Sequence, residues 1–208
     1  MNIRTITVGN MGEQCYLLID DNHDAVMVDP GDDANILLHE LEAADATLKA
    51  ILITHGHFDH IAAVEEIRAK TGAKVIAHKE GKRYLTDPTY NLSNMIGKNI
   101  SFEADMYVSA NEEIKLNDSE LTFKVLYVPG HTSDGVAFYH AATATLFAGD
   151  IIFRNSVGRT DLPGSNTLQL LEGIKSKIFK LPDATLIYPG HGLRTTVGFE
   201  KKNNTFVK

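Results

Sequence analysis

The sequence is poor in cysteine and has no tryptophan. Its 208 residues include a single cysteine, Cys15, so no intrachain disulfide can form and nothing points to an oxidising compartment. Cys15 opens the apolar run 15–19, a context typical of a small core residue rather than a nucleophile. A chain of this length can bury a substantial hydrophobic core, so its fold does not depend on covalent cross-links.

Basic residues are fewer than acidic ones, 20 against 27, which gives a formal net charge of −7 at pH 7. This balance argues against a broad nucleic-acid-binding surface. The sequence also lacks an apolar run near the roughly 20 residues that a membrane-spanning helix needs. Residues 1–5 do not resemble the start of a secretion signal. We therefore expect a cytoplasmic protein with no nucleic-acid partner and no membrane partner.

Short apolar runs alternate with helical patterns along the chain. Strands are predicted at 15–19, 25–28, 50–53, 74–77, 121–128, 135–140, 144–148 and 184–188. Helices are predicted at 32–44, 61–72 and 167–180, with a short helix after Thr195. Residues 85–105 and 154–165 are rich in turn-forming residues and are predicted to be irregular. The alternation indicates one mixed α/β domain spanning residues 1–208.

Five of the apolar runs end in a turn that contains glycine or proline together with histidine or aspartate. These turns are Asp29-Pro30-Gly31, Thr54-His55-Gly56-His57, Pro129-Gly130-His131, Gly149-Asp150 and Pro189-Gly190-His191. Proline ends a strand and glycine permits a sharp turn, so the polar side chain can project beyond the sheet edge. The pattern favours a site built where the five turns meet, although the sequence alone leaves open whether they share one edge.

The segment His55-Gly56-His57-Phe58-Asp59-His60 carries the strongest chemical signal. Residues i and i+2 of an extended chain face the same side, so His55 and His57 can hold one metal ion together. Asp59 and His60 then enter the next helix, where they are placed for a neighbouring metal ion. Imidazole and carboxylate ligands without thiolates suit Zn, Fe or Mn.

The remaining histidines separate into two groups. His131 and His191 share the context Pro-Gly-His at a strand end, and with Asp150 they are candidate metal ligands. The other four have no such neighbours and are predicted to play ordinary structural roles. They are His23, His39, His78 and His140.

These separated motifs, in this order, resemble the metallo-β-lactamase superfamily, and within it the glyoxalase II-like hydrolases. The resemblance extends over essentially the whole chain. It implies an α/β fold of the four-layer αβ/βα sandwich type, in which two mixed sheets pack together with helices outside. It also implies seven metal ligands at one edge. The implied ligands are His55, His57 and His131 for the first metal, Asp59, His60 and His191 for the second, and Asp150 between the two.

The implied activity is hydrolysis of a small acyl thioester, such as S-D-lactoylglutathione, by a hydroxide that bridges two divalent metal ions. Zinc is the expected metal, and iron or manganese suits the same ligands. Asp59 would also orient the hydroxide. Asp29 matches a family position near the site and is expected to contact a ligand rather than a metal.

The loop at 153–164 bears on the substrate. Arg159 is expected to bind a substrate carboxylate, because glyoxalase II enzymes have a lysine at the matching place that contacts glutathione. The string Gly158-Arg159-Thr160-Asp161 is also similar to persulfide dioxygenases, which use one iron. A mononuclear iron persulfide dioxygenase is therefore the alternative. His191 favours the hydrolase, since those dioxygenases leave the second metal site empty.

Several properties stay open at this level. Full-length glyoxalase II enzymes carry a further helical domain that helps to bind glutathione, whereas seventeen residues follow His191 here, so glutathione recognition is undecided. β-Lactamase activity is disfavoured by the absence of a cysteine near the metal motifs. The sequence does not fix the oligomeric state, nor which tyrosine lines the pocket among Tyr84, Tyr90, Tyr107 and Tyr139.

Overall fold

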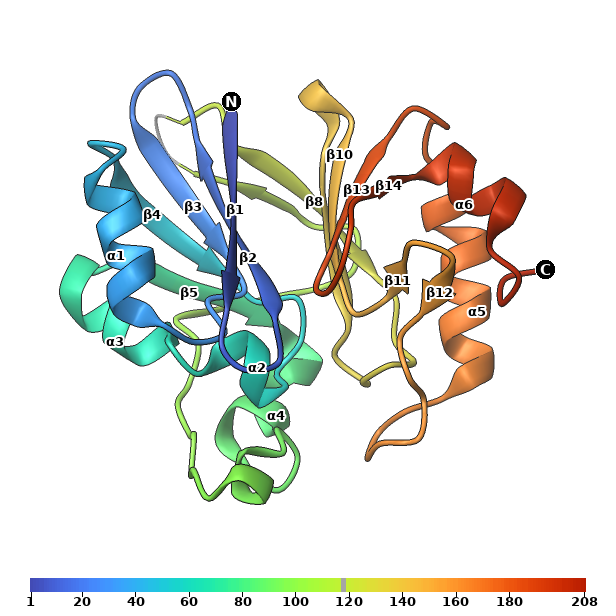
Figure 1. The fold of residues 1–208 in the computed structure, drawn as a ribbon, viewed down its shortest axis with the longest axis horizontal. Helices are drawn as coiled ribbons and strands as arrows, with labels where there is room; N and C mark the ends of the chain where they lie inside the picture. The colour runs from blue at the N-terminus through green and yellow to red at the C-terminus, as the bar shows by residue number, and fades with distance from the viewer. Residues whose placement is uncertain (117–118) are drawn as a thin grey trace.

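Two six-stranded sheets face each other, with helices on both outer sides, in the computed structural model (Figure 1). The structure describes residues 1–116 and 119–208. The first sheet has the order β1 (Asn2–Val8), β2 (Glu13–Ile19), β3 (Asp24–Val28), β4 (Thr47–Leu52), β5 (Lys74–His78) and β6 (Met106–Val108). The second has the order β14 (Thr195–Thr196), β13 (Leu186–Pro189), β10 (Thr145–Gly149), β9 (Val136–His140), β8 (Thr122–Tyr127) and β7 (Glu113–Lys115).

The helices cover the outer faces and the lower edge in Figure 1. The first sheet is covered by α1 (Ala34–Glu42) and α3 (Val64–Thr71), and the second by α5 (Thr167–Ser176) and α6 (Val197–Asn203). The lower edge carries α2 (Phe58–Ile61) and α4 (Lys82–Thr86). The remaining short elements are η1 (Lys79–Gly81), η2 (Ser93–Ile96), η3 (Ala141–Thr143), η4 (Ile178–Lys180), β11 (Ile152–Phe153) and β12 (Ser156–Val157).

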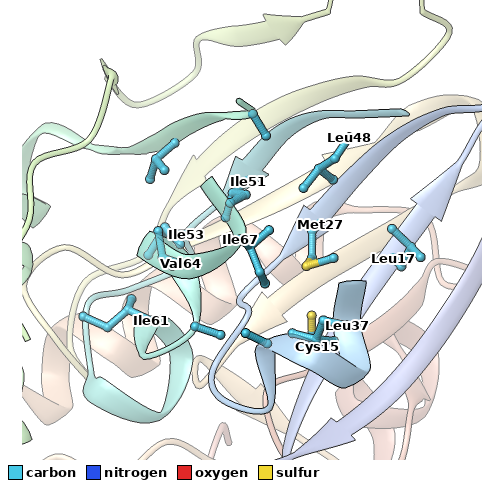
Figure 2. Close-up of a cluster of buried hydrophobic side chains, with 14 of the residues drawn as sticks. Cys15, Leu17, Met27, Leu37, Leu48, Ile51, Ile53, Ile61, Val64 and Ile67 are labelled. Carbon is cyan, nitrogen blue, oxygen red and sulfur yellow. The ribbon is translucent and has the colours of Figure 1, made fainter. Parts of the chain in front are cut away.

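Successive side chains along each strand point to opposite faces of the sheet, and this divides the core into layers. In β2, Cys15 and Leu17 face the helices, whereas Tyr16 and Leu18 face the second sheet. Figure 2 shows the outer layer of the first sheet, where Cys15 and its neighbours pack against side chains of α1 and α3. A third buried layer lies between the second sheet and α5 and α6. The predicted core position of Cys15 is therefore confirmed.

Strand directions explain why the polar turns come together. Strands β3 and β4 are parallel, so the turns that follow them leave the same edge of the first sheet. In the second sheet, β8 and β10 both run antiparallel to β9, and β13 is parallel to β10. The turns after β8, β10 and β13 therefore also leave one edge. Two backbone hydrogen bonds join the sheets there, from Gln14 to Gly190 (2.8 Å) and from Val136 to Thr54 (2.9 Å).

The expected fold class is confirmed: two mixed sheets pack together with helices outside. Several boundaries differ from the sequence prediction. The helix expected at 61–72 is divided into α2 and α3, and the one expected at 167–180 into α5 and η4. Strands β1, β6 and β7 were not predicted, and β12 lies within the loop expected at 154–165. In the part of the chain that the structure describes, no helix combines the length and apolar character needed to cross a bilayer.

Candidate metal centre

The polar turns converge at the shared edge and form two clusters of side chains, and a third group, Asp29 with His55 and His60, shares one histidine with each cluster. The first cluster consists of His55, His57 and His131, and the second of Asp59, His60 and His191. Within each cluster the nitrogen or oxygen atoms that can act as ligands lie within 4.8 Å of one another. Both clusters combine residues from the β4–α2 segment with a residue that follows a strand of the second sheet.

In the first cluster, imidazole nitrogens face one another at short distances. His57 Nδ1 lies 3.1 Å from His55 Nε2 and 3.1 Å from His131 Nε2. His131 Nδ1, which points away from the cluster, donates a hydrogen bond to the Arg159 carbonyl at 2.8 Å. The other ring nitrogen, Nε2, therefore presents a lone pair. This lone pair of His131 Nε2 points into the space that the three imidazoles share. A metal ion can accept lone pairs there, so the geometry fits a metal ion.

A chain of hydrogen bonds fixes the tautomer of His55. Asp29 accepts from the Thr54 backbone N–H at 2.7 Å and from its hydroxyl at 2.5 Å. Because the Thr54 hydroxyl proton goes to Asp29, the Nδ1–H of His55 donates to that hydroxyl oxygen at 3.2 Å. The Nε2 atom of His55 is then a lone-pair donor toward the cluster.

In the second cluster, Asp29 also orients His60. The Nδ1–H of His60 donates to Asp29 Oδ2 at 3.0 Å, which leaves Nε2 as the ligand atom. Among the described residues, this buried Nε2 has no hydrogen-bond partner. His191 Nε2 lies 3.3 Å from Asp59 Oδ2. The structure thus places Asp29 against a histidine of the second cluster and, through Thr54, against one of the first.

Asp150 lies between the clusters. Its carboxylate is 3.5 Å from His60 Nε2, 3.6 Å from His131 Nε2 and 3.7 Å from His191 Nε2. The turn that follows β13 leaves little room beside it, because a Cβ atom on Gly190 would lie 2.3 Å from Asp150 Oδ1. A carboxylate in this position can contact two cations at once.

The electrostatics of the two clusters differ. Burial, and then the neighbouring His131, lowers the pKa of His57 to about 3. Burial likewise lowers the pKa of His55 and of His131. Burial alone would lower the pKa of His60 too, but the carboxylates of Asp59 and Asp150 outweigh it and raise that pKa well above its usual value. The first cluster therefore stays uncharged near neutral pH, whereas the second retains a proton when no metal is bound.

Two buried acids near the site were missed by the sequence prediction. Glu13, at the start of β2, is 1% exposed, and its Oε1 lies 3.8 Å from His60 Nδ1. Asp134 accepts a hydrogen bond from the Gly56 N–H at 3.0 Å, and burial raises the pKa of its carboxyl to about 7. The spacing of Asp134 three residues after His131 is a signal that could have found it. Glu13 could not have been found in this way, because a single glutamate before an apolar strand has no distinctive spacing.

A cavity of about 710 Å³, called the site cavity below, opens onto both clusters. Five of the predicted ligands line it: His57, Asp59, His131, Asp150 and His191. Arg159 also lines the cavity, but its guanidinium is exposed and forms two hydrogen bonds with Asp161, at 2.7 and 2.8 Å. In the region that the structure covers, none of the four candidate tyrosines lines this cavity. Tyr84 packs behind His57, with ring centroids 6.1 Å apart.

The four other histidines lie outside the clusters. His78 stacks on Tyr127 with ring centroids 4.3 Å apart, and His140 Nδ1 lies 2.8 Å from the Thr143 hydroxyl. His23 contacts the Asp45 carbonyl at 3.0 Å, and His39 is exposed on α1.

Comparisons with known proteins agree with this geometry. A family model described as "Metallo-beta-lactamase superfamily" matches residues 8–191. The chain is 34% identical over 209 residues to "Hydroxyacylglutathione hydrolase GloC" of Haemophilus influenzae, covering 100% of this chain and 98% of that protein. It is equally 34% identical to "Probable metallo-hydrolase YqgX" of Bacillus subtilis, with 100% and 98% covered.

Three solved structures have similar folds. The structure titled "BLEG-1 B3 metallo-beta-lactamase" is 37% identical, with a TM-score of 0.94 and 99% of each chain covered. "TTHA1623 in a di-iron-bound form" is 33% identical, with a TM-score of 0.85 and 98% of this chain and 99% of that chain covered. "ETHE1 from Myxococcus xanthus" is 28% identical, with a TM-score of 0.80 and 99% and 84% covered.

Proposed function

The chain belongs to the metallo-β-lactamase superfamily as a metallo-hydrolase, and from this premise we propose that it hydrolyses small acyl thioesters with a pair of divalent metal ions. The observation that supports two ions is the division of the ligands into two clusters with Asp150 in contact with both. A single ion in either cluster would leave three or more polar groups facing one another without a partner. The di-iron form of TTHA1623 is consistent with this proposal.

The residues that would hold the ions are those named above: His55, His57 and His131 on one side, Asp59, His60 and His191 on the other, and Asp150 between. When bound, such ions lower the pKa of water toward neutrality and polarise a carbonyl group. Zinc is the metal we propose, since nitrogen and carboxylate ligands suit it.

The chain's own side chains supply orientation. Asp29 and the Arg159 carbonyl hold the imidazoles of His60 and His131 in one tautomer. Asp59 lines the site cavity, where a carboxylate oxygen can accept a hydrogen bond from the attacking water and so orient it. We propose that Arg159 binds a substrate carboxylate through the N–H groups that Asp161 leaves free, since Asp161 accepts from only two of the five.

Two other activities have specific support. The string Gly158-Arg159-Thr160-Asp161 supports the alternative of a persulfide dioxygenase with one iron. Similarity to BLEG-1, titled a B3 metallo-beta-lactamase, supports β-lactam hydrolysis despite the sequence-based expectation. The three activities consume different substrates, so one panel of assays distinguishes them.

The test combines elemental analysis of the purified protein with turnover of S-D-lactoylglutathione, glutathione persulfide and a chromogenic cephalosporin. We expect two metal ions per chain and thioester hydrolysis that a chelator abolishes. One iron per chain with oxygen consumed in proportion to persulfide would overturn the proposal, and so would turnover of the cephalosporin alone. The cytoplasmic location and the single domain spanning 1–208 stay predictions of the sequence.

A further inference from the structure

Large apolar side chains are exposed around the entrance of the site cavity. Met11, Met95 and Ile96 are 59%, 76% and 46% exposed, and all three line this cavity. Met11 comes from the turn between β1 and β2, whereas Met95 and Ile96 lie on η2. Two segments that are more than 80 residues apart in the sequence thus place apolar side chains at one opening. Exposed apolar groups gathered at a cavity mark a binding surface rather than chance exposure.

Other residues that line the same cavity are apolar too. They include Leu92, Phe153 and Leu162, and the ring centroid of Phe153 lies 6.2 Å from that of His191. We call Met11, Met95 and Ile96 the apolar wall. Two residues of the wall lie near the second cluster, because Met11 and Ile96 also line a smaller cavity, of about 260 Å³, together with Phe58 and Asp59. An apolar group attached to a reacting carbonyl near Asp59 would therefore lie against the wall.

The charges at the cavity do not match a strongly anionic substrate group. Among the described residues that line the site cavity, Arg159 is the one arginine or lysine, and two of its five N–H groups already donate to Asp161. A glutathione group carries two carboxylates, each of which would need a cationic or hydrogen-bonding partner in the cavity. The cavity offers apolar surface instead.

We propose that the substrate is a thioester with an apolar arm of several carbon atoms, and that the apolar wall binds this arm and sets specificity. The inference rests on the proposed thioester hydrolysis and names its substrate class. The arm can be the acyl chain or the thiol substituent, since both are attached to the same reacting group. Each methylene buried against the wall is expected to raise kcat/KM about fourfold.

The experiment measures kcat/KM of the metal-loaded enzyme for two matched series of thioesters. One series lengthens the acyl chain from two to eight carbons on a constant short thiol, and the other lengthens the thiol on a constant acetyl group. We expect kcat/KM to rise along one of the series in the wild type. The series that shows the rise identifies which arm the wall binds.

Variants test whether the wall causes this preference. Met95→Ser and Ile96→Ser should flatten the dependence of kcat/KM on chain length, because each removes apolar surface from the wall. Leu168→Ser and Ile36→Ser are the controls, because these residues are 72% and 50% exposed and lie outside the cavity lining. The controls should keep the full dependence on chain length.

Binding gives a readout that does not depend on turnover. Non-hydrolysable thioethers of the same chain lengths should bind more tightly as the chain grows, and Met95→Ser should remove that gain in calorimetry. Equal chain-length dependence in wall variants and wild type, or none in the wild type, would overturn the inference. If S-D-lactoylglutathione is hydrolysed and no chain-length dependence is found, only this inference fails. If no thioester is hydrolysed, the proposed function fails with it.

Discussion

In His55, His60 and His131 the ring nitrogen that points away from the clusters takes part in a hydrogen bond, which fixes the other nitrogen as a lone-pair donor. The partners are the Thr54 hydroxyl for His55, Asp29 for His60 and the Arg159 carbonyl for His131. These partners come from three different segments, so the ligand atoms are oriented before any ion binds. At the scale of single residues, the site is thus preorganised for cations.

Removing one ligand tests the role of the clusters. We expect His57→Ala and Asp59→Ala each to lower kcat/KM at least about a hundredfold, because each removes a donor from one cluster. His39→Ala is the control, since this exposed histidine lies on α1 away from the site. Both kcat/KM and metal content should fall in the first two variants. Neither should change in the control. Wild-type rates in either ligand variant would exclude these residues from catalysis.

The two clusters should lose metal at different pH values. In the metal-free protein, the pKa of His60 is raised by its carboxylate neighbours and that of His191 by Asp59, in both cases against the effect of burial. A metal ion must displace a proton there, so affinity at the second cluster should rise about tenfold per pH unit through neutrality. The pKa values of the first cluster are lowered, so its affinity should change little above pH 6.5.

The measurement is metal content after dialysis at a buffered free-metal concentration between pH 8 and pH 6. The expected course is two ions per chain at high pH and one, retained by the first cluster, at low pH. Simultaneous loss of both ions, or loss from the first cluster alone, would contradict this assignment of charges.

At the scale of elements, the turn between β8 and β9 supports the segment that carries His55 and His57. Asp134 in this turn accepts the N–H of Gly56, and burial raises the pKa of its carboxyl from 3.8 to about 7. The folded protein therefore holds a proton on Asp134 that the unfolded chain releases between about pH 4 and pH 7. The stabilising effect of this protonated group is complete below pH 3.8 and is lost as pH rises toward 7.

Asp134→Asn removes this titration and keeps an oxygen for the Gly56 N–H. The free energy of unfolding of the variant, minus that of the wild type, should therefore increase by roughly 2–3 kcal/mol as pH rises from 5 to 7.5. Denaturant unfolding at constant ionic strength measures the difference, with Asp21→Asn on the exposed β2–β3 turn as control. A difference between Asp134→Asn and wild type that does not change with pH would show that Asp134 does not titrate in this range.

Elements with strong periodic patterns were predictable from the sequence, and weak ones were not. Strand β2 contains the continuous apolar run 15–19 and helix α3 has Val64 and Ile67 at helical spacing, and both elements were expected. Strand β1 was missed because it is an edge strand in which the consecutive polar residues Arg4 and Thr5 interrupt the apolar alternation. Strands β6 and β7 have three residues each, too few to show a period.

The candidate site was predictable where the residue type itself is informative. Histidines in glycine-containing turns after apolar runs marked candidate ligands, and the resemblance to the superfamily implied the full set of seven, which includes Asp59 and Asp150. The convergence of their turns follows from strand directions, which the sequence does not encode locally. The burial of Glu13 depends on the pairing of its backbone with His191 across the two sheets, and local sequence does not reveal such a contact.

At the scale of the whole molecule, the clusters join the two halves of the sandwich. The β4–α2 segment supplies His55, His57, Asp59 and His60 from the first half, and the other three ligands follow strands of the second. A metal ion in either cluster therefore links the two sheets. It binds the folded chain much more tightly than the unfolded one, so it stabilises the fold.

Metal removal should lower the melting temperature. An ion present at a hundred times its dissociation constant contributes about 2.7 kcal/mol, which corresponds to a shift of at least about 5 °C for a chain of this size. Differential scanning calorimetry with and without chelator measures the shift, and added zinc should restore the original value. An unchanged melting temperature would mean that no ion links the sheets.

The central claim is that seven side chains hold two cations side by side, and anomalous diffraction from a metal-loaded crystal tests it most directly. The account predicts two anomalous peaks, one among the nitrogens of His55, His57 and His131 and the other among Asp59, His60 and His191, with Asp150 beside both. A single peak in a fully loaded crystal, or a peak away from these atoms, would contradict it.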